Sequence, residues 1–283
     1  MKIALTGAMG LVGRYTSAEL ARAGHQVVAL THHPSQDCAF PQKVVDITDF
    51  PAVREAVRGC DAVIHLAAIP HPAGDKDSSV MHTNVIGDYN VVLAAGLLGI
   101  RRVAIASSDC ALGITWSHSK IDRVKYLPVD EEHPASPDNG YGLSKLLSER
   151  MCNAMSLRFP ELSIASLRIT HVLRPEAYRS AGFLDWTKDP DAGPENLWSY
   201  IDARDCAAAF RLAVENYRPG RHEVYYIAAD NTRSRIPSRE LIRRYYPGAE
   251  LRGPFSGFES LEINRKARRL LGFAPLHRWD VPE

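Results

Sequence analysis

The sequence predicts an α/β fold, in which a doubly wound parallel sheet carries a small lobe built from later parts of the chain. Short runs rich in Val, Ile and Ala recur through the first half, and each is continuously apolar rather than alternating. Continuous apolar strands are expected where helices cover both faces of a parallel sheet. Stretches with helical periodicity separate these runs, and this alternation is typical of a doubly wound sheet.

The expected elements follow this order along the chain. Strands are predicted at 2–6, 26–30, 43–46, 62–68, 102–107, 163–168 and 223–228, and helices at 11–23, 50–58, 78–98, 141–159 and within 200–217. Two short basic helices are predicted in "RELIRRYY" and "NRKARRLLG". Connections between the parallel strands are expected to be right-handed crossovers.

Composition argues against several classes of protein. The chain has 283 residues and a formal net charge of +1, which gives no electrostatic reason to expect nucleic acid or an anionic membrane as partner. Its five cysteines are scattered without a CxxC pair, which favours reduced thiols over disulfides or a zinc site. No apolar run approaches the roughly 20 residues of a membrane span, and "MKIALTG" enters a strand pattern at once, without a signal peptide. We expect a cytoplasmic protein.

The stretch "TGAMGLVGR" follows the first strand and opens the first helix. Its glycines, Gly7, Gly10 and Gly13, permit a tight turn, close approach of the backbone to a pyrophosphate, and close packing of helix on strand. The N–H groups of the helix N-terminus then face the phosphates. In this context the spacing predicts dinucleotide binding on a Rossmann-type domain, formed by 1–168 with 201–230 returning to it. Residues 169–200 and 231–283 are predicted to form a small substrate-binding lobe.

The end of the second strand bears on the choice between NAD and NADP. An acidic side chain there accepts a hydrogen bond from the ribose 2′-hydroxyl of NAD, whereas basic groups tolerate the 2′-phosphate of NADP. This strand ends in Thr31, His32 and His33, without a carboxylate. The pattern favours NADP slightly; the alternative is that the histidines are solvated loop residues and the ribose is held otherwise.

A serine, a tyrosine and a lysine are predicted to meet at the carboxyl end of the sheet. Ser107 and Ser108 end the fifth strand, and "YGLSK" places Tyr141 and Lys145 one helical turn apart. Removing a hydride from an alcohol carbon requires taking its hydroxyl proton, and a free phenol titrates near pH 10, too high for a base. A neighbouring ammonium and a cationic nicotinamide would lower that pKa. Tyr141 is then the acid/base, Lys145 its cationic neighbour, and Ser108 the group that orients the substrate oxygen.

With these motifs in order, the chain resembles the extended short-chain dehydrogenases/reductases, the NAD(P)-dependent sugar epimerases, dehydratases and dehydrogenases. The matching stretches include "TGAMGLVG", "VDITD", "DAVIHLAA", "TNVIG", "IASSDCALG", "YGLSK" and "SLRI". The resemblance implies catalytic roles for Ser108, Tyr141 and Lys145, with Ser107 as the alternative serine. It also implies a set of cofactor-binding residues: Gly7, Gly10, Leu11, Val12, Gly13, Thr31, His32, Asp46, Ile47, Leu66, Ala67, Ala68, Asn84, Tyr141, Lys145 and Ile169.

Two departures from that family bear on the substrate. His171 stands where nucleotide-sugar epimerases have an asparagine that holds a phosphate, and the segment after Arg168 is short. We therefore expect an oxidoreductase acting on a small sugar or sugar acid. Arg174 is a candidate to fork a carboxylate, and the alternative is that it is a solvated arginine before Pro175. An epimerase or dehydratase, including one for nucleotide sugars, and a non-catalytic dinucleotide sensor are the alternatives.

Two remaining expectations concern metals and assembly. His65, His118, His133 and His171 lack the spacing of a metal site, so none is predicted. By the same resemblance, the helices near 78–98 and 141–159 pair two subunits into a homodimer. In the second helix, the apolar residues are Leu143, Leu146, Leu147, Cys152 and Met155, more than one sheet face requires.

Overall fold

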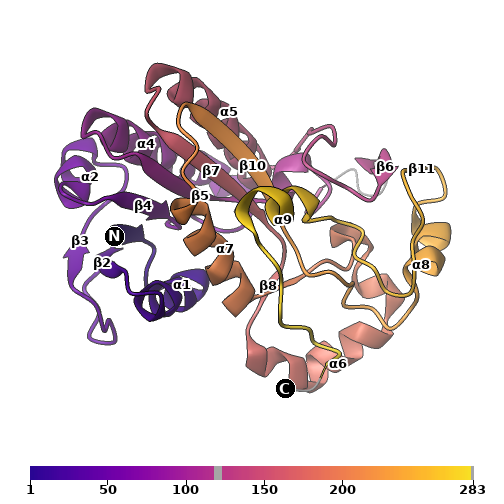
Figure 1. The fold of residues 1–283 in the computed structure, drawn as a ribbon. Helices are drawn as coiled ribbons and strands as arrows, with labels where there is room; N and C mark the ends of the chain where they lie inside the picture. Colours follow the sequence, from indigo (N-terminus) through magenta and orange to yellow (C-terminus); the bar gives the residue numbers. More distant parts are fainter. Residues whose placement is uncertain (118–122, 282–283) are drawn as a thin grey trace.

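A computed structural model, which describes residues 1–117 and 123–281, confirms the α/β fold (Figure 1). Its central sheet has seven parallel strands in the order β10-β7-β5-β4-β1-β2-β3. The strands are β1 (Lys2–Thr6), β2 (Gln26–Thr31), β3 (Gln42–Val44), β4 (Ala62–His65), β5 (Arg102–Ser108), β7 (Ser163–Ile169) and β10 (Arg221–Ile227). The strand order reverses between β1 and β4, which is where open sheets of this kind bind ligands.

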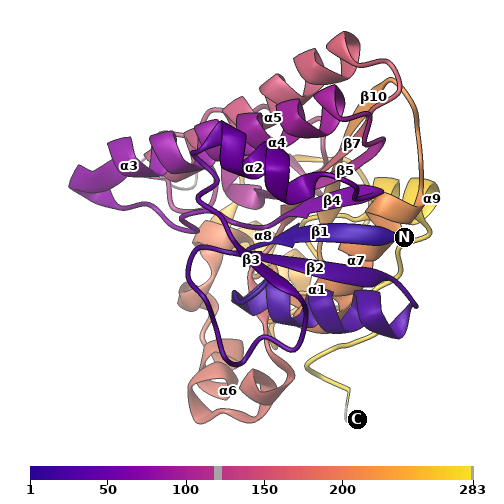
Figure 2. The same cartoon turned by 90° about the vertical axis from the view of Figure 1, so that its left-hand side faces the viewer.

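Helices cover both faces of the sheet, as the apolar strands predicted (Figure 2). Helices α1 (Leu11–Arg22) and α7 (Ala203–Glu215) lie on one face, and α2 (Phe50–Val57), α4 (Gly87–Leu97) and α5 (Gly140–Arg158) on the other. Successive side chains of β1 lie on opposite faces of the sheet. Ile3 and Leu5 belong to the same apolar cluster as Phe210 of α7, and Ala4 belongs to that of Val92 of α4. Each strand position is thus buried on one side or the other, which explains the continuous apolar runs.

The helix expected at 78–98 is present in three consecutive pieces. Helix α3 (Asp77–Met81) leads into a π-helical turn (His82–Ile86) and then into α4. The wider turn lies around Asn84, whose side chain is buried. Such π-turns within a helix are often found beside functional sites.

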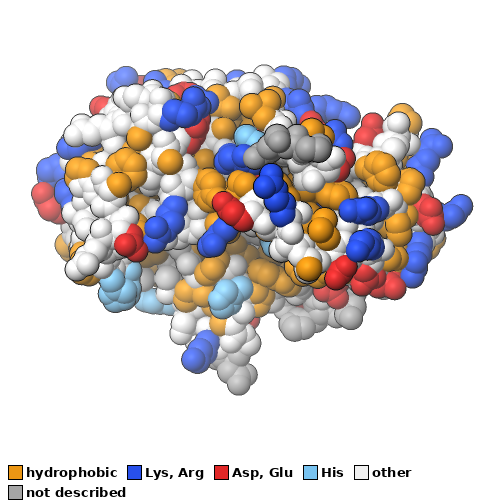
Figure 3. All heavy atoms as spheres, turned by 90° about the horizontal axis from the view of Figure 1, so that it is seen from below, with side chains coloured by type: hydrophobic (Ala, Val, Ile, Leu, Met, Phe, Trp, Pro, Cys, Tyr) orange, Lys and Arg blue, Asp and Glu red, His pale blue; other side chains and the backbone are white. Residues whose placement is uncertain are grey.

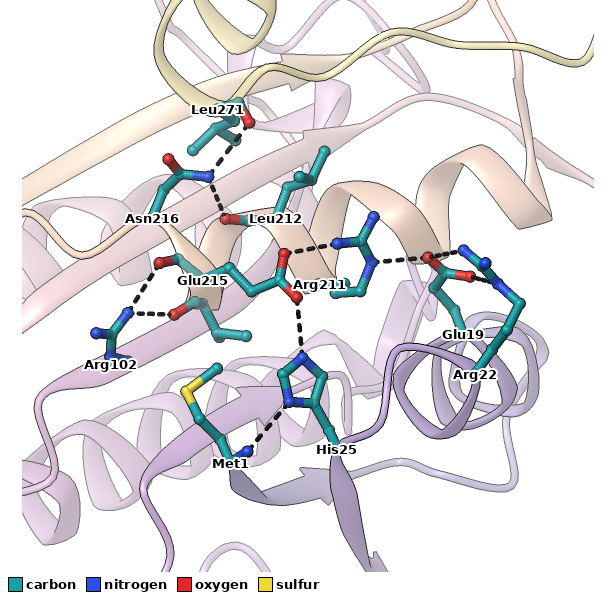
Figure 4. A network of polar contacts seen from close by, with 11 residues as sticks. Met1, Glu19, Arg22, His25, Arg102, Arg211, Leu212, Glu215, Asn216 and Leu271 are labelled. Carbon is teal, nitrogen blue, oxygen red and sulfur yellow. Dashed lines mark hydrogen bonds and ion pairs between the residues drawn. The ribbon is translucent and has the colours of Figure 1, made fainter.

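A polar network joins α7 to α1 and to the start of the chain (Figure 4). Arg211 of α7 bridges two carboxylates, donating to Glu19 of α1 at 2.7 Å and to Glu215 at 2.6 Å. The ring of His25 lies 2.9 Å from Glu215 and 3.3 Å from the amino group of Met1. These contacts fix the two helices of one layer against each other.

The lobe beside the sheet contains helix α6 (Ala181–Lys188), helix α8 (Ser238–Tyr245) and two small parallel pairs of strands. Strand β8 (Val172–Leu173) pairs with β9 (Ile201–Asp202), and β6 (Tyr126–Leu127) pairs with β11 (Glu250–Leu251). Single 3-10 turns occur at Gly74–Lys76, Asp109–Leu112, Pro175–Arg179, Pro190–Ala192 and Pro194–Asn196. The lobe core is an apolar cluster drawn from distant segments, including Leu112, Val129, Trp198, Leu241 and Leu261.

The C-terminal helix α9 (Arg265–Leu271) does not pack where the sequence predicted. Its residues Ala267 and Leu271 join the apolar core on the α1 and α7 face of the sheet, together with Phe273. The predicted division into a sheet domain and a lobe therefore differs from the packing at this point, and its other boundaries remain a prediction.

The apolar residues of α5 divide between the sheet and the surface. Cys152 and Met155, expected to supply surplus surface, are buried in the core against the sheet. Leu143 and Leu147 are exposed, as are Ile86 and Leu97 near α4. On the face seen in Figure 3, basic and acidic side chains are interspersed among apolar ones. In the described ranges no helix has the length and apolar character needed to cross a membrane.

Candidate active site

A cavity of about 880 Å³ lies at the carboxyl ends of β1, β4, β5 and β7, between the sheet and the lobe. Most of the predicted site residues line it: Gly7, Gly10, Leu11, Val12, Gly13, Leu66, Ala67, Ala68, Ser107, Ser108, Tyr141, Lys145, Ile169 and His171. The structure thus brings the glycine turn, the serine and the Tyr/Lys pair to a single space.

The glycine turn has the geometry of a phosphate cradle. Gly7 has a φ of +64°, and a Cβ there would lie 2.8 Å from the backbone nitrogen of Ala67. A Cβ on Gly13 would lie 2.1 Å from the carbonyl oxygen of Gly7. The N–H of Arg14 is the first in α1 to bond back to Gly10, so the preceding N–H groups of Leu11 and Val12 are available at the cavity. These features fit a dinucleotide whose pyrophosphate sits at the start of α1.

A buried chain of polar groups supports the opposite wall of the cavity. The hydroxyl oxygen of Thr6 accepts hydrogen bonds from the N–H groups of Leu66 and Ala67, both at 3.0 Å. Its single proton is therefore donated to Nδ1 of His65, 2.6 Å away. This leaves the Nε2 proton of His65 facing Asp88, at 2.9 Å. The contacts give His65 a positioning role in the sheet rather than one in the cavity.

The two adjacent serines differ in what their hydroxyls contact. Ser108 donates to Asp109 Oδ1 at 2.9 Å and accepts from the N–H of Cys110 at 3.2 Å. Ser107 donates to Glu149 at 2.6 Å, and Glu149 forms a buried pair with Arg168. Both hydroxyl protons are thus held by buried carboxylates, so these hydrogen bonds do not distinguish Ser108 from Ser107, and both serines line the cavity.

Tyr141 and Lys145 lie in the first turns of α5, whose N-terminus is capped by a side chain. The side chain of Asn139 caps the helix by accepting from the N–H of Gly142 at 2.8 Å. Lys145 is 2% exposed, and its Nζ donates to the carbonyl of Ala106 at 2.8 Å. Its Nζ lies 6.0 Å from the centre of the Tyr141 ring. The pair therefore shares one face of the helix, as its spacing predicted.

The protein groups alone do not lower the pKa of the tyrosine, so the expected lowering depends on the cationic nicotinamide and remains a prediction. Burial raises the pKa of Tyr141 above its usual value, and nearby Cys110 and Asp109 act in the same direction. Ser108 opposes the rise, while Lys145 is bound to a backbone carbonyl instead of to the phenol. Tyr141 is accordingly protonated at neutral pH, ready to donate a proton.

Five predicted cofactor residues lie outside the cavity lining, and four of them lie near the ends of β2 and β3. Thr31 is buried at the end of β2, and His32 is exposed beside His33, with their ring nitrogens 3.1 Å apart. Asp46 is exposed and accepts from the N–H and the hydroxyl of Thr48. Ile47 is buried against Gly87. These residues lie near the ends of β2 and β3, and their contact with the adenosine end of a dinucleotide remains a prediction.

Two other predictions do not match the contacts. Asn84 uses both amide hydrogens inside the protein, donating to the Ile69 carbonyl and the Ser144 hydroxyl, both at 3.1 Å. It therefore shapes the cavity from behind. Arg174 is exposed, precedes the 3-10 turn at Pro175–Arg179 and does not line the cavity, so the predicted carboxylate fork is wrong in this conformation.

The lobe adds residues that sequence reasoning did not assign. Arg233, from the loop after β10, is buried at the cavity wall, and Asp109 and Asn196 also line it. Of the tryptophans that could wall a pocket, Trp116 and Trp186 do so, whereas Trp198 is fully buried in the lobe core. No periodic pattern marks Arg233, because its position depends on how a loop folds back.

The histidines and cysteines give no metal site within the described part of the chain, where no cluster of three ligands occurs. His133 is buried and accepts from the N–H of Lys125 at 3.0 Å, and His118 lies outside the described residues. Burial raises the pKa of Cys110, and its neighbour Asp109 adds to the rise, so the thiol at the cavity wall is protonated.

The chain is similar to known sugar dehydrogenases. The chain is 33% identical to an L-arabinose 1-dehydrogenase (NAD(P)⁺) of Haloferax volcanii, over 77% of this chain and 84% of the relative. It is 30% identical to an NAD-dependent glucose-6-phosphate dehydrogenase of the same organism, over 82% of this chain and 86% of the relative.

A solved structure gives the same fold. It is a short-chain dehydrogenase/reductase superfamily protein of Agrobacterium tumefaciens with bound NAD, which superposes with a TM-score of 0.75 at 23% identity. The match covers 99% of this chain and 94% of the other. The model of the NAD-dependent epimerase/dehydratase family matches residues 3–228, a span that contains the glycine turn, Ser108, Tyr141 and Lys145. The chain therefore belongs to the NAD-dependent epimerase/dehydratase family.

Proposed function

We propose that this protein is an NAD(P)-dependent dehydrogenase that transfers a hydride between nicotinamide and a hydroxyl-bearing or carbonyl carbon of a small sugar or sugar acid. The main observation in support is that Ser108, Tyr141 and Lys145 line the same cavity as the glycine turn. The two curated relatives described above are named as sugar dehydrogenases and match most of this chain.

The dinucleotide supplies or accepts the hydride, and the protein's own groups handle the proton. Tyr141 holds a proton at neutral pH because burial raises its pKa, so it can donate to a carbonyl oxygen in the reductive direction. In the oxidative direction it accepts the hydroxyl proton once positive charge in the cavity lowers that pKa. Ser108, held by Asp109 and the N–H of Cys110, orients the substrate oxygen.

A small substrate is supported by the size of the cavity and by the residues in it. About 880 Å³ must accommodate both the dinucleotide and the substrate, whereas pockets for one drug-sized ligand span roughly 300–1,000 Å³. His171 takes the position of the phosphate-binding asparagine, and burial and the charge of Arg233 lower its pKa, so it stays neutral near pH 7. These features favour a free sugar over a nucleotide sugar.

Three finer proposals concern the preferred cofactor, the oligomeric state and the location in the cell. We propose a slight preference for NADP, because His32 and His33 lie at the end of β2 and Arg14 follows the glycine turn. We propose a homodimer through α4 and α5, whose exposed surfaces include Leu97, Leu143 and Leu147. The free cysteines fit a reducing compartment, so the cytoplasm is the proposed location.

The proposal is tested by initial rates with purified protein. NAD⁺ and NADP⁺ are each combined with pentoses, hexoses, hexuronates and hexose phosphates, and with uridine- and thymidine-diphosphate sugars, and reduced cofactor is followed by absorbance. Turnover of a small sugar supports the proposal. Epimerisation of a nucleotide sugar without net cofactor reduction would establish the family's other activity instead.

A further inference from the structure

The guanidinium of Arg233 is a buried charge without a countercharge. Arg233 is 2% exposed and lines the cavity. Its Nη2 donates to the Ala192 carbonyl at 2.7 Å and to Asn196 Oδ1 at 3.3 Å, both neutral acceptors. Its Nε and Nη1 are buried, and no group in the described residues accepts a hydrogen bond from them. Leaving such donors unsatisfied is costly, so a group that satisfies them would bind favourably.

Another buried arginine shows the usual arrangement in this protein. Arg168, 5% exposed, donates to both carboxylate oxygens of Glu149, at 2.9 and 2.7 Å. Arg233 has no ion pair with any described carboxylate, although the exposed Asp189 is close enough to act on it electrostatically. Burial lowers its pKa to about 10, which still leaves the guanidinium charged at neutral pH. The protein therefore maintains one unpaired positive charge at the wall of its substrate cavity.

The surroundings of Arg233 suit an anion that arrives with a ligand. The ring of Trp186 covers the guanidinium, with the central carbon 4.9 Å from the ring centre. Trp186 is 45% exposed, and no described residue accepts a hydrogen bond from its indole, so the ring can turn outward without losing one. His171 lies beside the same ring, with centroids 5.8 Å apart, and adds a neutral polar group to this end of the cavity.

We propose that Arg233 is the substrate-specificity residue of this cavity and that it binds an anionic group, a carboxylate or a phosphate, carried by the sugar. The inference rests on the proposed dehydrogenase function and narrows its substrate class to anionic sugars. Trp186 turns away from the guanidinium when the anion enters, and the anion takes the donors that now lack partners. The proposal also explains why the exposed Arg174 is not required for that role.

The test compares Arg233→Met with wild type on neutral and anionic sugars, using glucose and arabinose, glucuronate, and glucose 6-phosphate. Hydrogen bonds to a charged group contribute enough that KM for the anionic substrate should rise on the order of 10- to 100-fold. Rates with neutral sugars and the affinity for the dinucleotide should change by less than about twofold. Comparing glucuronate with glucose 6-phosphate identifies whether the anion is a carboxylate or a phosphate.

Arg235→Met is the matched control, because Arg235 is two residues away in the same loop, also lies near a tryptophan ring and is exposed outside the cavity. Three results would overturn the proposal. Arg233→Met could lose activity equally on all sugars or lose only dinucleotide affinity, or the wild type could act on neutral sugars alone. If Arg233→Met does not fold, Arg233→Lys should retain the preference for anionic sugars with a KM raised several-fold. An unchanged preference and an unchanged KM in Arg233→Lys would count against the proposal.

A binding measurement separates this inference from the proposed function. If no sugar is oxidised by the wild type, the dehydrogenase assignment fails, and the anion site is then tested by thermal unfolding with the dinucleotide present. Glucuronate or inorganic phosphate should raise the Tm of the wild type and of Arg235→Met but not that of Arg233→Met. A shift of equal size in all three proteins, or no shift in any, would refute the anion site.

Discussion

Asp88 is predicted to stabilise the fold as a buried anion near Lys145, and Asp88→Asn tests this. Asp88 is 1% exposed, lies 2.9 Å from Nε2 of His65 and accepts from the hydroxyl of Ser148. Burial alone would raise its pKa, but the charge of Lys145 and the contacts with His65 and Ser148 lower it below the usual value. Asp88 is thus ionised, and its charge interacts with that of Lys145 over a distance rather than in a direct ion pair.

Removing that charge should lower the free energy of unfolding, and the loss should be large because Asp88 is fully buried. Breaking a buried charged contact costs about 3–5 kcal/mol, and Asp88 is contacted by both His65 and Ser148 inside the protein. For a chain of this size about 2 °C of Tm corresponds to each kcal/mol, so Tm should fall by roughly 6–10 °C. Asn keeps the shape of the side chain, so the change reports the charge rather than a cavity.

The pH dependence of stability is a second test of the charge assigned to Asp88. The pKa of Asp88 is lower in the folded than in the unfolded protein, so its stabilisation is fully present above the unfolded value, near 4. It is lost as the pH falls through the lowered folded pKa. The gap in free energy of unfolding between wild type and Asp88→Asn should therefore be full at pH 7 and narrow below about pH 4.

The assay is equilibrium urea unfolding followed by circular dichroism across that range. Asp185→Asn is the control, since Asp185 is exposed and its ion pair among the described residues is with the exposed Lys188; it should change stability by less than about 0.5 kcal/mol. If Asp88→Asn matches this control at pH 7, or if its effect is the same at every pH, the assigned role of Asp88 is wrong.

Three further outcomes are expected. Tyr141→Phe should lower turnover by a factor on the order of 10² or more with nearly unchanged dinucleotide affinity, whereas Lys145→Ala should weaken both; full turnover in Tyr141→Phe would reject the acid/base role. Leu143→Glu with Leu147→Glu should convert a dimer to a monomer in light scattering, and a wild-type monomer at micromolar concentration would exclude the dimer. A dehydrogenase releases cofactor each turnover, so the protein should purify largely free of nicotinamide, and stoichiometric NAD in the denatured supernatant would favour an epimerase.

The sheet and the Tyr/Lys pair could be predicted because they depend on local patterns. The order of strands and helices follows from apolar runs and helical periods, and the positions of Gly7, Ser108 and Tyr141 at one edge follow from parallel strands. The chain between Arg168 and Tyr200 carries no such period. Its helix α6 has only eight residues, and the lobe strands have two each.

Other features depend on contacts between distant segments. The charge environment of Tyr141 follows from burial beside Cys110 and Asp109, which no spacing in "YGLSK" reveals. The segment of α9 was predicted to belong to the lobe, yet Ala267 and Leu271 pack in the core on one face of the sheet. Arg233 looks like any loop arginine until its loop folds against Trp186.

The lobe has a consequence for how this protein can change over evolutionary time. Its core joins Leu112 and Val129 from before α5, Trp198 from before α7, and Leu241 and Leu261 from after β10. The chain thus leaves the sheet for the lobe on three separate occasions. The lobe is therefore discontinuous in the sequence, and no single continuous segment contains it. Exchange of the whole lobe between relatives by recombination would need several simultaneous crossovers. New substrate preferences are accordingly expected to arise by single substitutions at cavity positions such as His171 and Arg233, with the scaffold inherited intact.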